Sequence, residues 1–185
     1  MSTQTANAGY NIPEEHAELW RQLQEFVFDE PGAEYNFSKR LAKRNKWDIA
    51  LALRVIEEYR KFLFLLKVTG HMVTPSTFVD EAWHLHLIYT YSYWEVLCLR
   101  IFKQPIHHHP GNGSDADQAK FAAIYERTLD DYKRFFGEPP VQIWGKPNDS
   151  IDWRAILAAL PVLPKRAKST LLELFLSLPM KRCRQ

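Results

Sequence analysis

Apolar residues recur at intervals of three and four positions along most of this chain, and this spacing constrains its fold more than any other feature. One example comprises Leu19, Leu23, Phe26 and Val27. Such spacing places apolar side chains on one face of an α-helix, whereas a half-buried β-strand requires alternation, which the sequence does not contain. The sequence therefore predicts an all-α fold, a single-domain bundle of about six to seven helices with a His-rich loop.

Prolines, glycines and capping residues indicate where the helices begin and end. Thr74-Pro75 has the pattern of an N-cap followed by proline in the first turn, and we expect one continuous helix from there to Phe102. A helix that begins at Ser114 or Asp115 is expected to end at Gly137. The other expected helices span roughly 13–28, from 37 onward, 47–68, 151–160 and 169–178.

The same pattern predicts which side chains point inward. Phe37 and Leu41 are expected to face the core from the second helix. In the helix at 47–68, the expected inward stripe comprises Ile49, Leu53, Ile56, Phe62 and Leu63.

The length of 185 residues, of which 46% are hydrophobic, is sufficient for one buried core. We expect residues 1–12 to be a disordered N-terminus and residues 13–164 to form the helical domain. Residues 165–185 are expected to form a basic, apolar C-terminal helix. This helix has six basic residues and one acidic residue, and could contact a membrane surface or a protein partner. Docking on the domain is the favoured interpretation.

The charge and cysteine content exclude several classes of function. With 24 basic and 22 acidic residues, the chain has no overall field that would attract nucleic acid, and no specific nucleic-acid binding is expected. Two cysteines are too few for a secreted disulfide framework. The N-terminus does not resemble a signal peptide, and no apolar run approaches the 18 or so residues of a membrane span, so a cytoplasmic location is expected. The sequence also contains no Walker loop, dinucleotide fingerprint or nucleophile elbow.

The residues that could carry chemistry lie between Asp80 and His109, where five of the seven histidines occur. In an α-helix Asp80 and His84 are one turn apart on one face, and His86 points roughly 160° away from His84. If the helix continues, the same face also includes Leu87, Tyr91, Trp94 and Cys98.

A carboxylate and an imidazole one turn apart can bind one metal ion. A histidine from the loop at His107, His108 and His109 would complete a set of two histidines and one carboxylate, which leaves open positions for water or substrate. The sequence thus predicts a site for a divalent metal, zinc or iron. Alternatively, Asp80 fixes the tautomer of His84 while other histidines bind the metal.

His86 is a further candidate for this site. It could join only if the helix is distorted, and it could instead face a second polar pocket with His71 or Glu95, or belong to a buried hydrogen-bond network.

If the site is catalytic, a metal-dependent hydrolase or oxygenase is expected, with Glu81, Tyr91 or Glu95 as proton-transfer groups. The alternative function is a non-catalytic protein-interaction module in which the histidines and Asp80 are structural. The sequence does not specify the small molecule or protein that would be the partner.

Several of these residues also resemble a known family. Val79-Asp80, Trp83 to Leu87, and His107 to Pro110 are similar to the glycine-rich domain-containing protein-like family, and the likeness covers roughly Phe37 to Trp144. The resemblance implies that Asp80 and the histidines form a shared site, and it defines no activity. The chain has only seven glycines, as in a bacterial member without the glycine-rich tail, so functions tied to that tail are not implied.

Overall fold

The computed structural model of the protein describes residues 9–109, 111–112 and 114–145. The chain divides into two units, Met1–Lys146 and Pro147–Gln185, and all the described residues belong to the first. The helices expected at 151–160 and 169–178, and the C-terminal helix expected at 165–185, lie outside the described residues. Within the expected disordered N-terminus, residues 9–12 are described. Tyr10 packs its ring against Trp20 and Phe136, at centroid distances of 5.8 and 5.2 Å.

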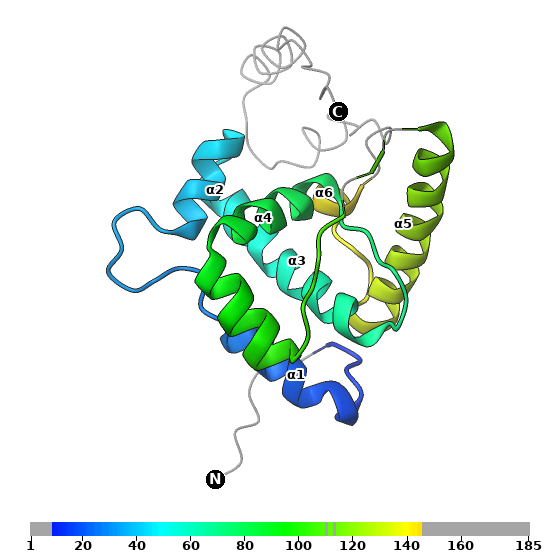
Figure 1. Cartoon of the computed structure of the whole chain (residues 1–185), viewed down its shortest axis with the longest axis horizontal. Helices are drawn as coiled ribbons and strands as arrows, with labels where there is room; N and C mark the ends of the chain where they lie inside the picture. Colours follow the sequence, from blue (N-terminus) through cyan, green and yellow to red (C-terminus); the bar gives the residue numbers. More distant parts are fainter. Residues whose placement is uncertain (1–8, 110, 113, 146–185) are drawn as a thin grey trace, which may run out of the picture. The chain divides into compact units, whose positions relative to one another are not determined.

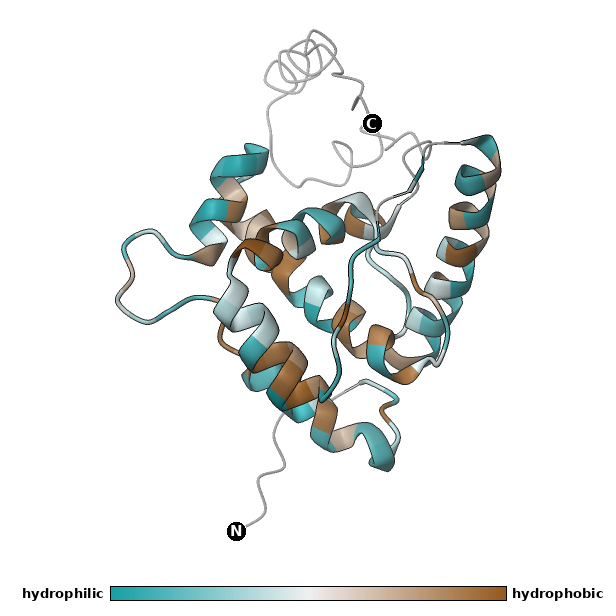
Figure 2. Cartoon of the chain, viewed as in Figure 1, coloured by the Kyte–Doolittle hydropathy of each residue, from teal (hydrophilic) through white to brown (hydrophobic). Residues whose placement is uncertain are grey.

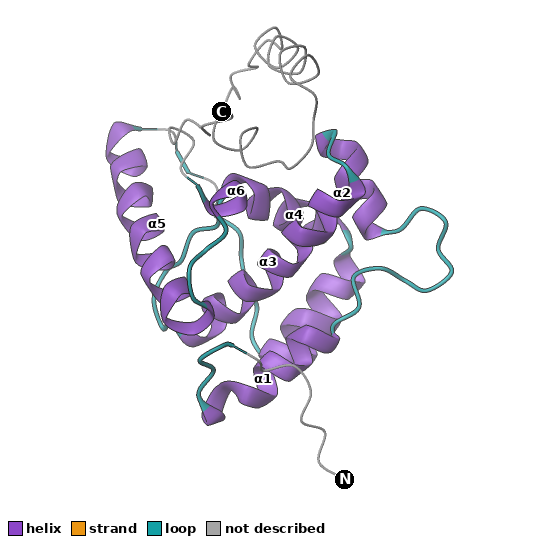
Figure 3. Ribbon diagram, turned by 180° about the vertical axis from the view of Figure 1, so that it is seen from behind, coloured by secondary structure: helices purple, strands orange, loops and turns teal. Residues whose placement is uncertain are grey.

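The described residues form seven helices and no strand, which confirms the all-α prediction (Figures 1 and 3). The helices are α1 (Glu14–Glu25), α2 (Phe37–Asn45), α3 (Ile49–Val68), α4 (Thr77–Ile88), the π-helix η1 (Tyr91–Phe102), α5 (Asp115–Phe136) and α6 (Val141–Trp144). None of the helices in the described residues is long and apolar enough to cross a membrane.

Helix α3 lies at the centre of the packing and contacts α1, α2, α4 and α5. Apolar residues are interspersed with polar ones along the helices (Figure 2), and the apolar face of α3 is buried. The expected inward stripe is correct at Ile56, Phe62 and Leu63 but wrong at Ile49 and Leu53, which are 46% and 47% exposed. The buried face of α3 is rotated around the helix axis relative to the predicted stripe. It also contains Ala52, Val55 and Tyr59, so that Ile49 and Leu53 lie at its edge.

Polar side chains cap the starts of α2, α3, α4 and α5, and the cap of α5 is the expected Ser114. Asn36 accepts a hydrogen bond from the backbone N–H of Lys39, and Ser114 accepts one from that of Asp117. Phe37 and Leu41 are both buried, as predicted. The prediction of Thr74 as an N-cap is wrong, because Ser76 caps α4 while the backbone N–H of Thr74 donates to Thr128 Oγ1 at 3.1 Å. That contact with α5 keeps Thr74 outside the helix.

The single helix predicted from 74 to 102 is wrong, because the chain breaks after Ile88. Tyr89 adopts φ −83° and ψ 64°, and the chain resumes as the π-helix η1, which runs in a different direction from α4 (Figure 1). A π-helix has wider turns than an α-helix. Consequently, the residues of η1 do not continue the face of α4 that carries Asp80 and His84, so Tyr91, Trp94 and Cys98 do not extend that face as expected.

Two smaller differences concern helix ends. Helix α1 ends at Glu25, three residues earlier than expected, although Phe26 and Phe28 beyond it remain buried. Helix α6 lies in a segment that was expected to be a loop, and it buries Ile143 and Trp144. Helix α5 ends at Gly137, as predicted.

Candidate metal centre

Three of the residues singled out in the sequence lie together, and we call them the Asp80 cluster: Asp80, His84 and His108. Helix α4 presents Asp80 and His84 one turn apart, with His84 Nδ1 3.7 Å from Asp80 Oδ2. His108 reaches them from the histidine loop (residues 103–114), with Nε2 2.8 Å from Asp80 Oδ1. One potential ligand atom from each residue lies within 4.8 Å of the other two. The cluster is therefore a group that could hold a metal ion.

The cluster is partly open to solvent. The side chains of His84, Asp80 and His108 are 38%, 32% and 16% exposed. Because a carboxylate only accepts hydrogen bonds, the contact with Asp80 places a proton on His108 Nε2. A metal ion that binds there would take the place of that proton.

Two buried aromatic residues, Trp83 and Tyr93, hold the part of the chain that carries His108. The Trp83 ring lies edge-on to His108, with centroids 4.5 Å apart. Trp83 Nε1 donates to the hydroxyl of Tyr93 at 2.9 Å, and that hydroxyl donates to the carbonyl oxygen of Ile106 at 2.8 Å. These contacts connect α4, η1 and the histidine loop.

The other two loop histidines do not join the cluster. His107 and His109 are exposed, and their ring centroids are 6.2 Å apart. The His107 ring lies 5.7 Å from that of Trp94 on η1. Of the three consecutive histidines, only His108 turns toward Asp80.

The residues considered for proton transfer lie outside the Asp80 cluster. Glu81 forms an ion pair with Arg44 of α2 at 3.5 Å. Tyr91 is 64% exposed and its hydroxyl accepts a hydrogen bond from Arg100. Glu95 is exposed on η1.

His86 belongs to a buried hydrogen-bond network, which is one of the alternatives that the sequence left open. Its Nδ1 lies 3.1 Å from the Tyr59 hydroxyl and its Nε2 3.1 Å from Ser92 Oγ. The ring is fully buried among aromatic side chains, and burial lowers the pKa of His86 to about 3. The ring is therefore neutral. His71 is elsewhere and pairs with Asp131 on α5.

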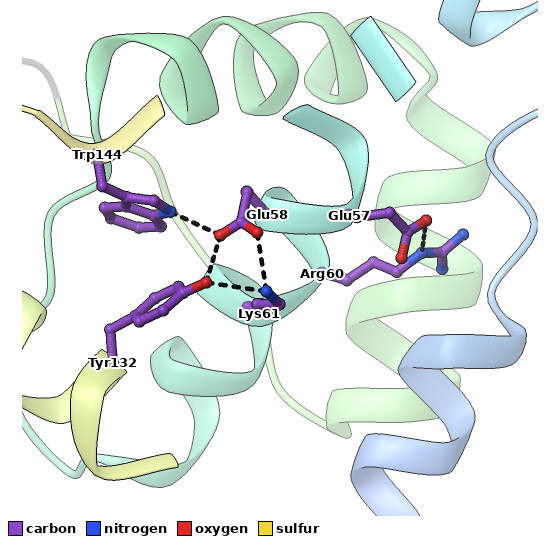
Figure 4. Close-up of polar contacts among 6 residues, drawn as sticks. All are labelled: Glu57, Glu58, Arg60, Lys61, Tyr132 and Trp144. Carbon is purple, nitrogen blue, oxygen red and sulfur yellow. Dashed lines mark hydrogen bonds and ion pairs between the residues drawn. The ribbon is translucent and has the colours of Figure 1, made fainter. Parts of the chain in front are cut away.

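Sequence reasoning missed a second polar group, which we call the Glu58 network: Glu58, Lys61, Tyr132 and Trp144 (Figure 4). The Glu58 carboxylate accepts hydrogen bonds from Lys61 Nζ at 2.8 Å, the Tyr132 hydroxyl at 2.6 Å and Trp144 Nε1 at 2.8 Å. Burial, together with the neighbouring Glu58 carboxylate, raises the pKa of Tyr132. The only signal in the sequence was a glutamate within the apolar pattern of α3.

Among known proteins, the chain matches one family model. No curated protein and no solved structure matches the chain. A family model described as UCP032817-like matches residues 21–126, a span that contains the whole Asp80 cluster and Glu58 but neither Tyr132 nor Trp144. That description names no activity and does not mention a glycine-rich domain. Because the match covers more than half of the 185 residues, the chain belongs to the UCP032817-like family.

Proposed function

We propose that the protein is a divalent-metal-binding helical domain in which Asp80, His84 and His108 are the ligands. The observation that carries this proposal is the convergence of one carboxylate and two imidazoles, from two separate segments, within 4.8 Å of one another.

The distances require little rearrangement. Ligand atoms about 2.0–2.2 Å from a zinc ion lie roughly 3.0–3.5 Å apart. His108 Nε2 lies 2.8 Å from Asp80 Oδ1 and His84 Nδ1 lies 3.7 Å from Asp80 Oδ2, so each imidazole is close to that spacing from one of the two carboxylate oxygens. All three potential ligand atoms lie within 4.8 Å of one another, so side-chain movements of about 1–1.5 Å would bring them to this spacing around an ion.

The ligand types favour zinc or ferrous iron over magnesium and calcium. Imidazole nitrogens suit the transition metals and zinc, whereas magnesium and calcium prefer oxygen ligands. Three protein ligands leave coordination positions open, and the exposed side of the cluster allows water or a small substrate to reach them. Such an ion polarises a bound oxygen or activates water, as in hydrolases, and iron in this ligand set also binds dioxygen in oxygenases.

Metal binding by protein purified without a metal-affinity column tests the proposal. After treatment with a chelator, the protein is dialysed against Zn²⁺ or Fe²⁺ and its metal content is measured. We expect about one ion per chain, and a loss of affinity of more than about tenfold in both His84→Ala and His108→Ala. His109→Ala is the matched control, because His109 is adjacent to His108 but exposed. Wild-type protein without metal, or variants with wild-type affinity, would overturn the proposal.

A second candidate function is a non-catalytic interaction module. The direct hydrogen bond between His108 and Asp80 favours it, because that bond by itself fixes the histidine loop on α4. In this case His108→Ala would lower the stability of the protein while neither it nor the wild type bound metal. The same metal measurements therefore separate the two candidates.

A further inference from the structure

We infer that Tyr93 is the positioning residue of the metal site, setting the place of His108 without contacting the ion. This inference rests on the proposed function and identifies what controls the strength of that site.

The Tyr93 hydroxyl connects two other segments of the chain, because it accepts a hydrogen bond from one and donates a hydrogen bond to the other. It accepts from Trp83 Nε1 on α4 at 2.9 Å and donates to the backbone carbonyl of Ile106 at 2.8 Å. Tyr93 itself is fully buried, so water does not compete for these bonds.

The bond to Ile106 acts on the histidine loop close to the ligand. Ile106 precedes His108 by two residues and is itself buried. Two residues earlier, the backbone N–H of Gln104 donates to the carbonyl oxygen of Cys98 on η1 at 3.1 Å. The start of the loop is thus attached to η1 immediately before the chain reaches the Asp80 cluster.

The bond from Trp83 acts from the other side. The Trp83 ring contacts the His108 ring edge-on at 4.5 Å, and the neighbouring residue on α4 is the ligand His84. With its indole N–H held by Tyr93, Trp83 presents a fixed surface against His108. One hydroxyl therefore fixes both the backbone that carries His108 and the ring that supports it.

Tyr93→Phe tests this inference, because it removes the hydroxyl and keeps the ring. The affinity for Zn²⁺ is measured by competition with a chromogenic chelator at a temperature at which circular dichroism shows every variant to be folded. Groups that orient metal ligands typically change affinity by about 10–100-fold, and we expect a loss in that range.

Tyr132→Phe is the matched control. Tyr132 is also a buried tyrosine that hydrogen-bonds with polar partners, but its partners belong to the Glu58 network. We expect it to lower stability while leaving the Zn²⁺ affinity within about twofold of wild type. Equal losses of affinity in the two variants would mean that general destabilisation is responsible, and would overturn the inference.

A second variant covers the case in which Tyr93→Phe does not fold. Trp83→Phe keeps the bond between Tyr93 and Ile106 and removes the indole donor, together with part of the ring that contacts His108, and a loss of several-fold is expected. Wild-type affinity in whichever variant folds would overturn the positioning role while leaving the metal site intact. A wild-type protein that binds no Zn²⁺ would instead overturn the proposed function, and the inference with it.

Discussion

The Glu58 carboxylate and the Asp80 carboxylate both lie on helices of the core, yet their surroundings differ. Glu58 is buried and accepts hydrogen bonds from three donors on α3, α5 and α6. Asp80 is 32% exposed and accepts one hydrogen bond, from His108, with His84 beside it. The Glu58 network satisfies its charge within the protein, as buried ionic groups must. The Asp80 cluster keeps nitrogen and oxygen atoms available to a ligand.

The difference indicates separate roles. A satisfied buried network connects helices that are far apart in the sequence, and its removal should affect folding. A half-exposed cluster contributes little to folding, and its removal should affect binding. Four predictions test this division.

The largest effect is expected from Glu58→Gln. The substitution leaves Lys61, whose side chain is only 13% exposed, without its counter-charge. Losing one partner of a buried pair costs about 3–5 kcal/mol of the free energy of unfolding, which urea denaturation measures. Glu57→Gln is the control, because Glu57 is 65% exposed in its pair with Arg60 (Figure 4) and should cost less than about 1 kcal/mol. Similar losses in the free energy of unfolding for the two variants would show that the Glu58 network contributes no more to stability than a surface ion pair.

The second prediction concerns His86, which shares α4 with His84 but is buried. The pKa of His86 is about 3 in the folded chain and 6.5 ordinarily, so between these pH values the unfolded chain binds a proton that the folded chain does not. Stability is therefore complete above pH 6.5 and is lost as the pH falls toward 3, at about 1.4 kcal/mol per pH unit.

We test this with His86→Gln, which keeps polar atoms at the position but cannot titrate. Between pH 6.5 and 4 the wild type should lose about 3 kcal/mol more stability than the variant, as measured by urea denaturation at each pH. Parallel pH profiles for the two proteins would contradict the neutral, buried state of His86.

The third prediction applies to the open cluster. If the Asp80 cluster binds Zn²⁺ only when folded, free Zn²⁺ at 100 times its Kd should raise the free energy of unfolding by about 2.7 kcal/mol. At the same Zn²⁺ concentration the increase should fall to about half or less in His84→Ala and persist in Glu58→Gln, whose stability is lower at the outset. An increase that is the same in all three proteins would indicate binding elsewhere.

The smallest effect is expected from Glu81→Gln. Glu81 adjoins Asp80 in the sequence, but it pairs with Arg44 at the surface, where an ion pair is worth about 0.5 kcal/mol. The Zn²⁺ affinity should stay within about twofold of wild type. A tenfold loss of affinity would show that the cluster extends to a second carboxylate.

Much of the fold follows from local signals. The apolar spacing predicted helices α2 and α5, and Ser114 or Asp115 was expected to cap α5, because a cap acts only on the few residues that follow it. The break at Tyr89 was not predicted, since the sequence there has neither glycine nor proline. Hydrogen bonds between side chains of α4 and η1 span the break, such as those between His86 and Ser92 and between Trp83 and Tyr93.

The sequence predicted those relations within the candidate site that follow from helical geometry alone. The rotation of 100° per residue placed Asp80 with His84 and directed His86 away. Three consecutive histidines in a loop are equivalent in sequence, so the choice of His108 depends on Trp83 and Tyr93 in three dimensions. The Glu58 network was missed for the same reason, because its members come from α3, α5 and α6.

The interruption between α4 and η1 has a consequence for the site. In an uninterrupted α-helix, ten residues correspond to about 15 Å along the axis, so the side chains of Trp83 and Tyr93 would be too distant and differently directed to form a hydrogen bond. The change of direction after Ile88 folds the second helix back, so that its buried tyrosine meets the indole of the first. A local failure of helix propagation thus creates a tertiary contact. Any sequence change that straightened this junction would release the histidine loop, even though no residue of the cluster had been altered.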